Sequence, residues 1–300
     1  MPWLGAVWAR AGAPRLTEVV LAIVAVLAVI SEFERTLPRE LLWDFGSFVE
    51  SGRAASEGLN PYGIYPLTFH VVLPGFEAWN PNLNPPVSAL LFQLFGLAEP
   101  HRMFRIWYGV SMALYAATVA LLLIRYRETP RLVLAIWAFA LAGFWDTLLL
   151  GQIYIPLVLA AVAGWLLLER GATIWAGVMI GAVIAIKPNF AVWPALLFLA
   201  GHFRPAIASV LTAAIISVIP VLVFGPDVYR QWFELIASDA ERAFFLTNAS
   251  LSGLAARAGF PAVGLALSAL LLAATALWAL MGRRSATEVS AVGLVVALLA

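Results

Sequence analysis

The chain has 300 residues, of which 63% are hydrophobic and only 12% are charged, and its formal net charge is +1. Soluble domains carry about 25% charged residues, so this composition excludes a soluble globular protein and indicates an integral membrane protein. The small net charge predicts no nucleic-acid partner, and the absence of cysteine excludes disulfides, thiolate nucleophiles and cysteine-ligated metals.

Long apolar runs predict an all-α polytopic membrane protein. The first run, Leu16 to Ile30, lacks a small-residue cleavage site, so we interpret it as an uncleaved anchor. A spanning helix needs about 20 apolar residues. The expected spans are 14–31, 104–124, 131–149, 152–168, 204–224, 260–281 and a last helix from about 288. Residues 86–97 are apolar but short, and we expect them to be half-inserted or re-entrant.

Two further apolar stretches, 174–186 and 189–200, are each too short to span alone. Lys187-Pro188 separates them, and proline removes a helical hydrogen bond, so we expect a broken hairpin over 174–200.

Basic residues between the spans give the orientation, because cytoplasmic loops are enriched in Lys and Arg. The residues that we place in the cytoplasm are Arg10, Arg15, Arg125, Arg127, Arg131, Arg170, Arg204, Arg283 and Arg284. Residues 32–103, the Gly151-Gln152 turn and the loop 225–259 then lie outside. We expect one membrane domain over 1–300. Since the apolar run Val289–Ala300 is short, either the last helix is partial or the natural protein continues.

Residues 41–57 are expected to form an amphipathic helix on the outer membrane surface. Apolar positions recur at helical spacing, while Asp44, Ser47 and Ser51 fall together on another face. Asp44 is therefore either a solvated interfacial charge or a functional carboxylate, and the residues alone leave both readings open.

Polar residues also mark two helix ends. Asp146 lies near the end of an apolar helix, where it either caps the turn or has a function, and Gln152 follows at the outer edge. Lys187 lies at the proline break, where an ammonium either snorkels to the surface or meets an anion. Because broken membrane helices often line cavities, Lys187 is a candidate ligand-binding residue.

Aromatic and amide side chains gather in residues 60–86, including Asn60, Tyr62, Tyr65 and Trp79. Aromatic planes and amides suit the C–H faces and hydroxyl rims of sugars. An interfacial aromatic belt has the same composition, so both interpretations stand at this point.

The loop 225–259 carries a second group of polar residues. Asp239 and Glu241 form an acidic pair beside Arg242, and we expect this pair to be solvated rather than to bind metal. Asn248 and Ser250 follow in the same loop.

These features, in this order, resemble glycosyltransferase family 87, the polyprenol-phosphate-mannose-dependent mannosyltransferases of the GT-C membrane class. The resemblance rests on Asp44, GLNPYG at 58–63, GQIYIPL at 151–157, KPNF at 187–190 and NASLSGLAARAG at 248–259. Tyr154 replaces a small polar residue, commonly Asn, and Ala249 replaces a frequent Gln. These two departures bear on donor or acceptor specificity rather than on the reaction class.

The resemblance implies a GT-C-like helical bundle in the cell membrane, whose extracytoplasmic first loop carries amphipathic helices and whose active site faces the same side. It implies transfer of a sugar, mannose in the family, from a polyprenyl-phosphate donor to a hydroxyl of a glycan or glycolipid acceptor. The reaction would be a direct, inverting displacement that needs no cofactor and no metal.

The resemblance also implies roles for individual residues. Asp44 would be the general base, because an alcohol must lose its proton as it attacks. A cation and hydrogen-bond donors would stabilise the leaving phosphate, and these are Lys187, Gln152 and Asn248. The implied acceptor or sugar contacts are Asn60, Tyr62, Tyr65, Trp79 and Ser250, and further candidate site residues are Asp146, Glu241 and Arg242.

Other functions remain open. Broken helices and a lysine at membrane level also fit a transporter or flippase for lipid-linked sugars, although no inverted repeat is evident and the polar residues cluster on one side. A GT-C enzyme for another sugar, such as glucose, arabinose or aminoarabinose, is the nearest alternative. A non-catalytic scaffold would not need outer loops so rich in prolines, amides and aromatics. Membrane lipid is an expected partner in every case.

Overall fold

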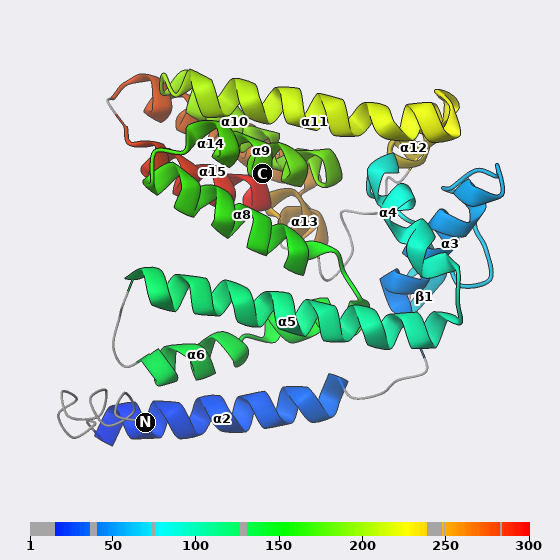
Figure 1. Cartoon of the computed structure of the whole chain (residues 1–300), viewed down its shortest axis with the longest axis horizontal. Helices are drawn as coiled ribbons and strands as arrows, with labels where there is room; N and C mark the ends of the chain where they lie inside the picture. Colours follow the sequence, from blue (N-terminus) through cyan, green and yellow to red (C-terminus); the bar gives the residue numbers. More distant parts are fainter. Residues whose placement is uncertain are drawn as a thin grey trace. The chain divides into compact units, whose positions relative to one another are not determined.

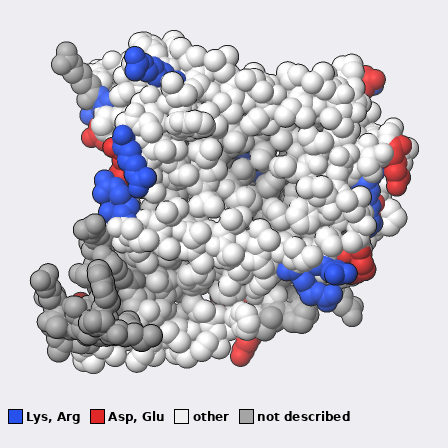
Figure 2. Space-filling view, viewed as in Figure 1, with Lys and Arg blue, Asp and Glu red and all other residues white. Residues whose placement is uncertain are grey.

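A computed structural model gives the fold, and it describes residues 16–36, 41–73, 76–126, 131–238, 248, 250–282 and 284–300. These residues are mostly helical (Figure 1), which confirms the all-α polytopic class. Four described helices are long and apolar enough to cross a membrane: α2 (Leu16–Thr36), α5 (Pro100–Tyr126), α11 (Phe203–Phe224) and α14 (Pro261–Leu280). Figure 2 shows a face that is mostly uncharged, as lipid contact requires.

The contacts of the chain divide it into two compact units. The first comprises Met1–Phe45 and His101–Leu159, and the second comprises Gly46–Pro100 and Ala160–Ala300. Two helices, α3 (Trp43–Ser56) and α8 (Tyr154–Glu169), each begin in the first unit and end in the second.

In the first unit, the single helix expected over 131–149 is instead two helices, α6 (Arg131–Phe139) and α7 (Ala142–Leu150), bent by 47°. A break leaves backbone carbonyls without helical partners, and in lipid these must be satisfied internally. Here Tyr115 Oη donates to Ala138 O at 2.8 Å, and Trp145 Nε1 donates to Phe139 O at 2.7 Å. Aromatic side chains therefore stabilise a bend that hydropathy alone does not reveal.

In the second unit, the break expected at Lys187-Pro188 is present. Helix α9 (Thr173–Ile186) ends there, and a 3₁₀ turn, η1 (Pro188–Ala191), leads into α10 (Val192–Leu199). The last helix, α15 (Ala286–Leu299), packs against α10, and Trp193 Nε1 donates to Ser290 Oγ at 2.8 Å.

Helices α9 and α11 lie side by side (Figure 1) because α9 presents two glycines four residues apart. A Cβ atom on Gly177 would lie 2.5 Å from Ala208 Cβ, and one on Gly181 would lie 2.5 Å from Ser209 O. Small residues at this spacing let helix backbones approach closely in membranes. The sequence GVMIG therefore sets the packing of this pair.

The segment between α3 and α5 folds more than its composition suggests. It contains an antiparallel hairpin of β1 (Phe69–Leu73) and β2 (Phe76–Asn80), and a short helix, α4 (Pro86–Gly96). Helix α4 approaches α3 at Gly52, where a Cβ atom would lie 2.6 Å from Gln93 N.

A buried group of polar side chains, the Asn82 network, joins α3 to this segment. Asn82 Nδ2 donates to Ser51 Oγ at 3.0 Å and to Ser88 Oγ at 2.8 Å, and Asn82 Oδ1 accepts from the backbone and side chain of Asn84. The polar face of α3 is thus buried rather than exposed at a membrane surface, since Ser47 and Ser51 are also buried.

The loop expected over 225–259 also contains two helices, α12 (Asp227–Ser238) and α13 (Leu251–Arg257). Helix α12 is anchored by Trp232, whose Nε1 donates to Leu83 O at 3.0 Å. Tyr62, Val228 and Trp232 form a small buried cluster.

Candidate functional site

Asp44 lies in the first turn of α3 and is only 5% exposed. A solvated interfacial charge is therefore the wrong reading of this residue. The preceding residue, Trp43, has φ of 48°, which is a sterically unfavourable left-handed conformation for a bulky side chain. Such backbone strain costs about 1–3 kcal/mol and clusters at functional sites, so it supports a functional role for the start of α3.

Gln152 reaches Asp44 from the turn between α7 and α8. Gly151 adopts φ of 68° and ends α7 in the left-handed conformation, which glycine tolerates best. Trp107 Nε1 fixes the turn by donating to Gly151 O at 3.1 Å, and Gln152 Nε2 donates a hydrogen bond to Asp44 Oδ2. Two predicted site residues, far apart in sequence, are thus brought into direct contact in the first unit.

The turn leaves no room for a larger residue at position 151. A Cβ atom there would lie 2.5 Å from Phe45 Cβ and 2.9 Å from Phe104 Cε2. Each residue of the GQ pair thus has a structural reason. Gly151 lets the turn approach Phe45 closely, and Gln152 then reaches the carboxylate of Asp44.

Lys187 is half-buried at the break after α9 in the second unit. Its backbone N–H donates to Val183 O at 2.8 Å, and its carbonyl accepts from Phe190 N at 3.1 Å. Asn189 holds the break in place, because its Nδ2 donates to Ala297 O of α15 at 2.7 Å. The KPNF sequence thus forms a fixed corner that carries the lysine.

Asn248 and Ser250 contact each other before α13. Asn248 Oδ1 accepts from Ser250 Oγ at 2.7 Å and from Ser250 N at 3.2 Å. Ser250 Oγ also caps α13 by accepting from Gly253 N at 3.1 Å, and Arg257 Nη1 donates to Asn248 O at 2.8 Å. With Oδ1 engaged, the part of Asn248 that suits an anionic oxygen is its Nδ2 group.

The predicted acceptor residues differ in their surroundings. Tyr62 is 5% exposed, and its hydroxyl donates to Asn84 O at 3.2 Å. Trp79 is 44% exposed and stacks on His70, with ring centroids 4.2 Å apart. Tyr65 is half-buried, and its hydroxyl donates to Asn60 O at 2.7 Å.

Asp146 forms an ion pair with Arg35 at the end of α2, with Nη2 and Oδ1 2.6 Å apart. Arg35 also contacts Glu32 at 2.7 Å. Glu241 and Arg242 lie outside the described residues.

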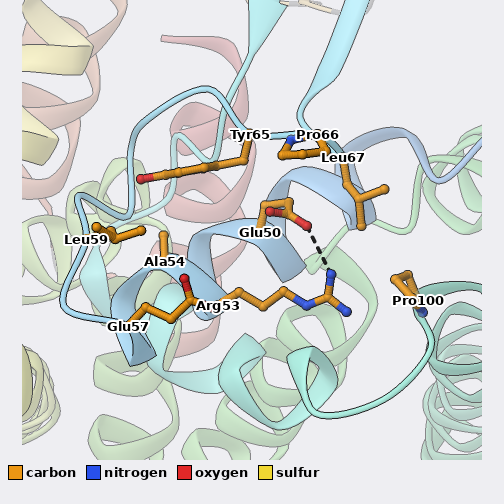
Figure 3. Close-up of a pocket in the computed structure, with 9 residues that line it drawn as sticks. All are labelled: Glu50, Arg53, Ala54, Glu57, Leu59, Tyr65, Pro66, Leu67 and Pro100. Carbon is orange, nitrogen blue, oxygen red and sulfur yellow. Dashed lines mark hydrogen bonds and ion pairs between the residues drawn. The ribbon is translucent and has the colours of Figure 1, made fainter.

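A cavity of about 400 Å³ lies between α3 and the loop that follows it (Figure 3). Its lining comprises Glu50, Arg53, Ala54, Glu57, Leu59, Tyr65, Pro66, Leu67 and Pro100. Of these residues, only Tyr65 was predicted from the sequence as part of a site. The missed signal was the spacing of Glu50, Arg53 and Glu57, which places all three on one helix face.

The sequence matches the family model of glycosyltransferase family 87 over residues 82–300. The chain belongs to glycosyltransferase family 87. It is therefore a glycosyltransferase that takes a donor and an acceptor substrate. The matched residues include three of the segments on which the resemblance rests, 151–157, 187–190 and 248–259, whereas Asp44 and 58–63 precede the matched range. No curated protein and no solved structure matches the chain.

Proposed function

We propose that this family 87 enzyme transfers mannose from a polyprenyl phosphate to a hydroxyl of a glycan or glycolipid on the extracytoplasmic face of the cell membrane. The observation that carries the proposal is the hydrogen bond from Gln152 to Asp44. It orients a buried carboxylate at the start of a helix, which is the requirement for a positioned general base.

In the proposed reaction, the acceptor oxygen attacks the anomeric carbon on the face opposite the phosphate. Asp44 takes the hydroxyl proton as the new C–O bond forms. The bond from the anomeric carbon to the phosphate oxygen breaks, and the polyprenyl phosphate leaves with the electron pair. One carboxylate suffices for this direct, inverting displacement, because the phosphate needs no proton to leave.

The leaving phosphate gains negative charge, which cations and N–H donors stabilise. We assign Lys187 to this role because the KPNF corner holds it at a helix break, a position where membrane proteins bind ions and polar ligands. Asn248 is assigned to the phosphate through its Nδ2 group, since its Oδ1 is engaged by Ser250. The GT-C class and the absence of a cofactor or metal requirement belong to the same proposal.

The acceptor side is assigned to Asn60, Tyr62, Tyr65, Trp79 and Ser250. Exposed Trp79 and half-buried Tyr65 offer aromatic surface to sugar C–H groups, whereas buried Tyr62 supports the loop from within.

Sugar transfer in proteoliposomes tests the proposal, with radiolabelled polyprenyl-phosphate-mannose and a crude glycolipid extract as acceptor. Asp44→Asn is expected to lower transfer by about 10²–10⁴-fold, because that is the usual contribution of a general base. Asp227→Asn on α12 is the matched control and should transfer at the wild-type rate. Sedimentation with labelled donor should show equal donor binding by wild type and Asp44→Asn.

Equal transfer by wild type and Asp44→Asn would overturn the role of Asp44. Lys187→Met provides a separate test of the phosphate role, with an expected increase of about tenfold in the KM for the donor. A flippase would be favoured by a different result: labelled donor moves across the bilayer equally in wild type and Asp44→Asn, and neither transfers sugar.

A further inference from the structure

The cavity beside α3 contains a carboxylate that is held in one orientation. Glu50 is 8% exposed, and its Oε1 lies 3.1 Å from Arg53 Nη1. Arg53 is itself fixed, since its Nε donates to Gly96 O at 3.1 Å and its Nη2 donates to Ala98 O at 3.2 Å. Among the described residues, Arg53 alone forms a hydrogen bond or ion pair with the Glu50 carboxylate, and it uses Oε1 (Figure 3). Because Glu50 lines the cavity, its second oxygen, Oε2, can accept a hydrogen bond from a ligand.

The opposite wall of the cavity is aromatic and apolar. Tyr65 lies across from Glu50 in Figure 3, with its hydroxyl tied to Asn60 O. Partial burial, and then the nearby charges of Glu50 and Glu57, raise the pKa of the Tyr65 phenol, so this ring stays neutral. Pro66 and Leu67 lie beside Tyr65 on this wall (Figure 3), and Leu59 and Pro100 add further carbon surface to the lining.

These charges favour a neutral ligand over an ion. An anion would meet the carboxylate of Glu57, while the guanidinium of Arg53 is already engaged in three directions. A cation would gain little from Glu50, because Arg53 neutralises that carboxylate at 3.1 Å. A volume of about 400 Å³ suits a small molecule rather than a lipid chain.

We infer that this cavity binds a neutral pyranose ring of the acceptor glycan, with Glu50 accepting hydrogen bonds from two hydroxyls and Tyr65 stacking against the C–H face. Arg53 is a positioning residue that orients Glu50. The inference rests on the proposed function for the name of its ligand, but binding at the cavity does not require turnover.

Saturation-transfer NMR on the full chain in nanodiscs tests the inference, with methyl α-D-mannoside as the first probe and the glucoside and galactoside beside it. Glu50→Gln should weaken the signal at least about fivefold, because it removes a charged acceptor of hydroxyl hydrogen bonds. Leu67→Trp should abolish the signal by filling the cavity while leaving the Glu50–Arg53 pair intact. Glu234→Gln on α12 is the matched control and should give the wild-type signal.

The inference is overturned if wild type shows no saturation transfer with any of the three glycosides. It is also overturned if Leu67→Trp gives an undiminished signal. If Glu50→Gln does not elute as a folded, monodisperse species, Leu67→Trp decides the outcome. Asp44→Asn should bind the glycoside normally. If the glycoside binds but no sugar is transferred, the binding site in the cavity is supported and the proposed function is rejected. If sugar is transferred but no glycoside binds, the proposed function is supported and the binding site is rejected.

Discussion

The side-chain amide of Gln152 donates a hydrogen bond to the carboxylate of Asp44, and so joins the turn after α7 to the first turn of α3. We expected Gln152 to bind the donor phosphate, but its amide nitrogen is directed to Asp44. Under the proposed function, Gln152 therefore positions the base.

Gln152→Ala should lower kcat by about 10–100-fold, because a misplacement of about 1 Å in a catalytic group can cost 10²-fold. The KM for the polyprenyl-phosphate donor should stay within about twofold if Gln152 acts on Asp44 alone. Steady-state transfer kinetics measure both, with Gln231→Ala on α12 as the matched control. An increase in donor KM at constant kcat would instead place Gln152 at the phosphate.

Asp146→Asn should leave transfer within about twofold of wild type, because Asp146 forms an ion pair with Arg35 across two helices. Both side chains are substantially exposed, at 52% and 38%, and exposed pairs contribute about 0.2–1 kcal/mol. Transfer assays and apparent unfolding midpoints in detergent check this expectation. A loss of transfer beyond tenfold would return Asp146 to the list of catalytic candidates.

Gly177→Ala should destabilise the protein by about 1–3 kcal/mol, because the new Cβ would lie 2.5 Å from Ala208 Cβ and 2.7 Å from Pro205 O. Gly109→Ala on α5 is the control, since a Cβ there meets no atom of the described residues within 4 Å. The control should be neutral or slightly stabilising, because alanine favours helix over glycine. Thermal unfolding in detergent measures the midpoints of the two variants. If Gly177→Ala and Gly109→Ala lower the midpoint equally, close packing of α9 and α11 is contradicted.

Stability should fall above about pH 10 through Tyr62. Burial raises the pKa of its phenol above the ordinary value of 10.0. Above pH 10 the unfolded chain releases this proton while the folded chain keeps it, so the free energy of unfolding decreases as the pH rises. Below pH 10 both states keep the proton, and this contribution is constant.

The matching variant is Tyr62→Phe, which has no phenol to titrate. Its unfolding midpoint should be lower than that of wild type at pH 8, because the hydrogen bond to Asn84 O is lost. Between pH 10 and 11 the midpoint of wild type should fall more steeply, so the two curves should converge. Parallel curves would show that Tyr62 ionises equally in both states.

Apolar runs were enough to predict the class and most helices. The runs now seen as α2, α5, α11 and α14 were predicted within a few residues, because lipid demands length and hydrophobicity before any tertiary detail. The break at Lys187 was also predicted, since proline acts locally. The bend between α6 and α7 was missed because it depends on hydrogen bonds from Tyr115 and Trp145, which are tertiary contacts.

The candidate site shows the same limit. Asp44 and Gln152 were both named from sequence, but nothing local indicates that one contacts the other. The composition of 60–86 suggested a loop, whereas β1 and β2 form through cross-strand pairing that short polar stretches do not announce. The orientation of Glu50 by Arg53 depends on the carbonyls of Gly96 and Ala98, which are remote in sequence.

The hydrogen bonds of Asn82 restrict how the segment between β2 and α4 can move. Its side-chain amide accepts twice and donates twice within the Asn82 network, so its hydrogen-bonding capacity is fully used. Surface loops of irregular backbone normally fluctuate in nanoseconds to microseconds. Displacing residues 81–85 would instead break several buried hydrogen bonds together and pull on α3 and α4. Residues 81–85 should therefore stay rigid on that timescale. They should move only when α3 and α4 partly unfold, which is a rarer event than loop fluctuation.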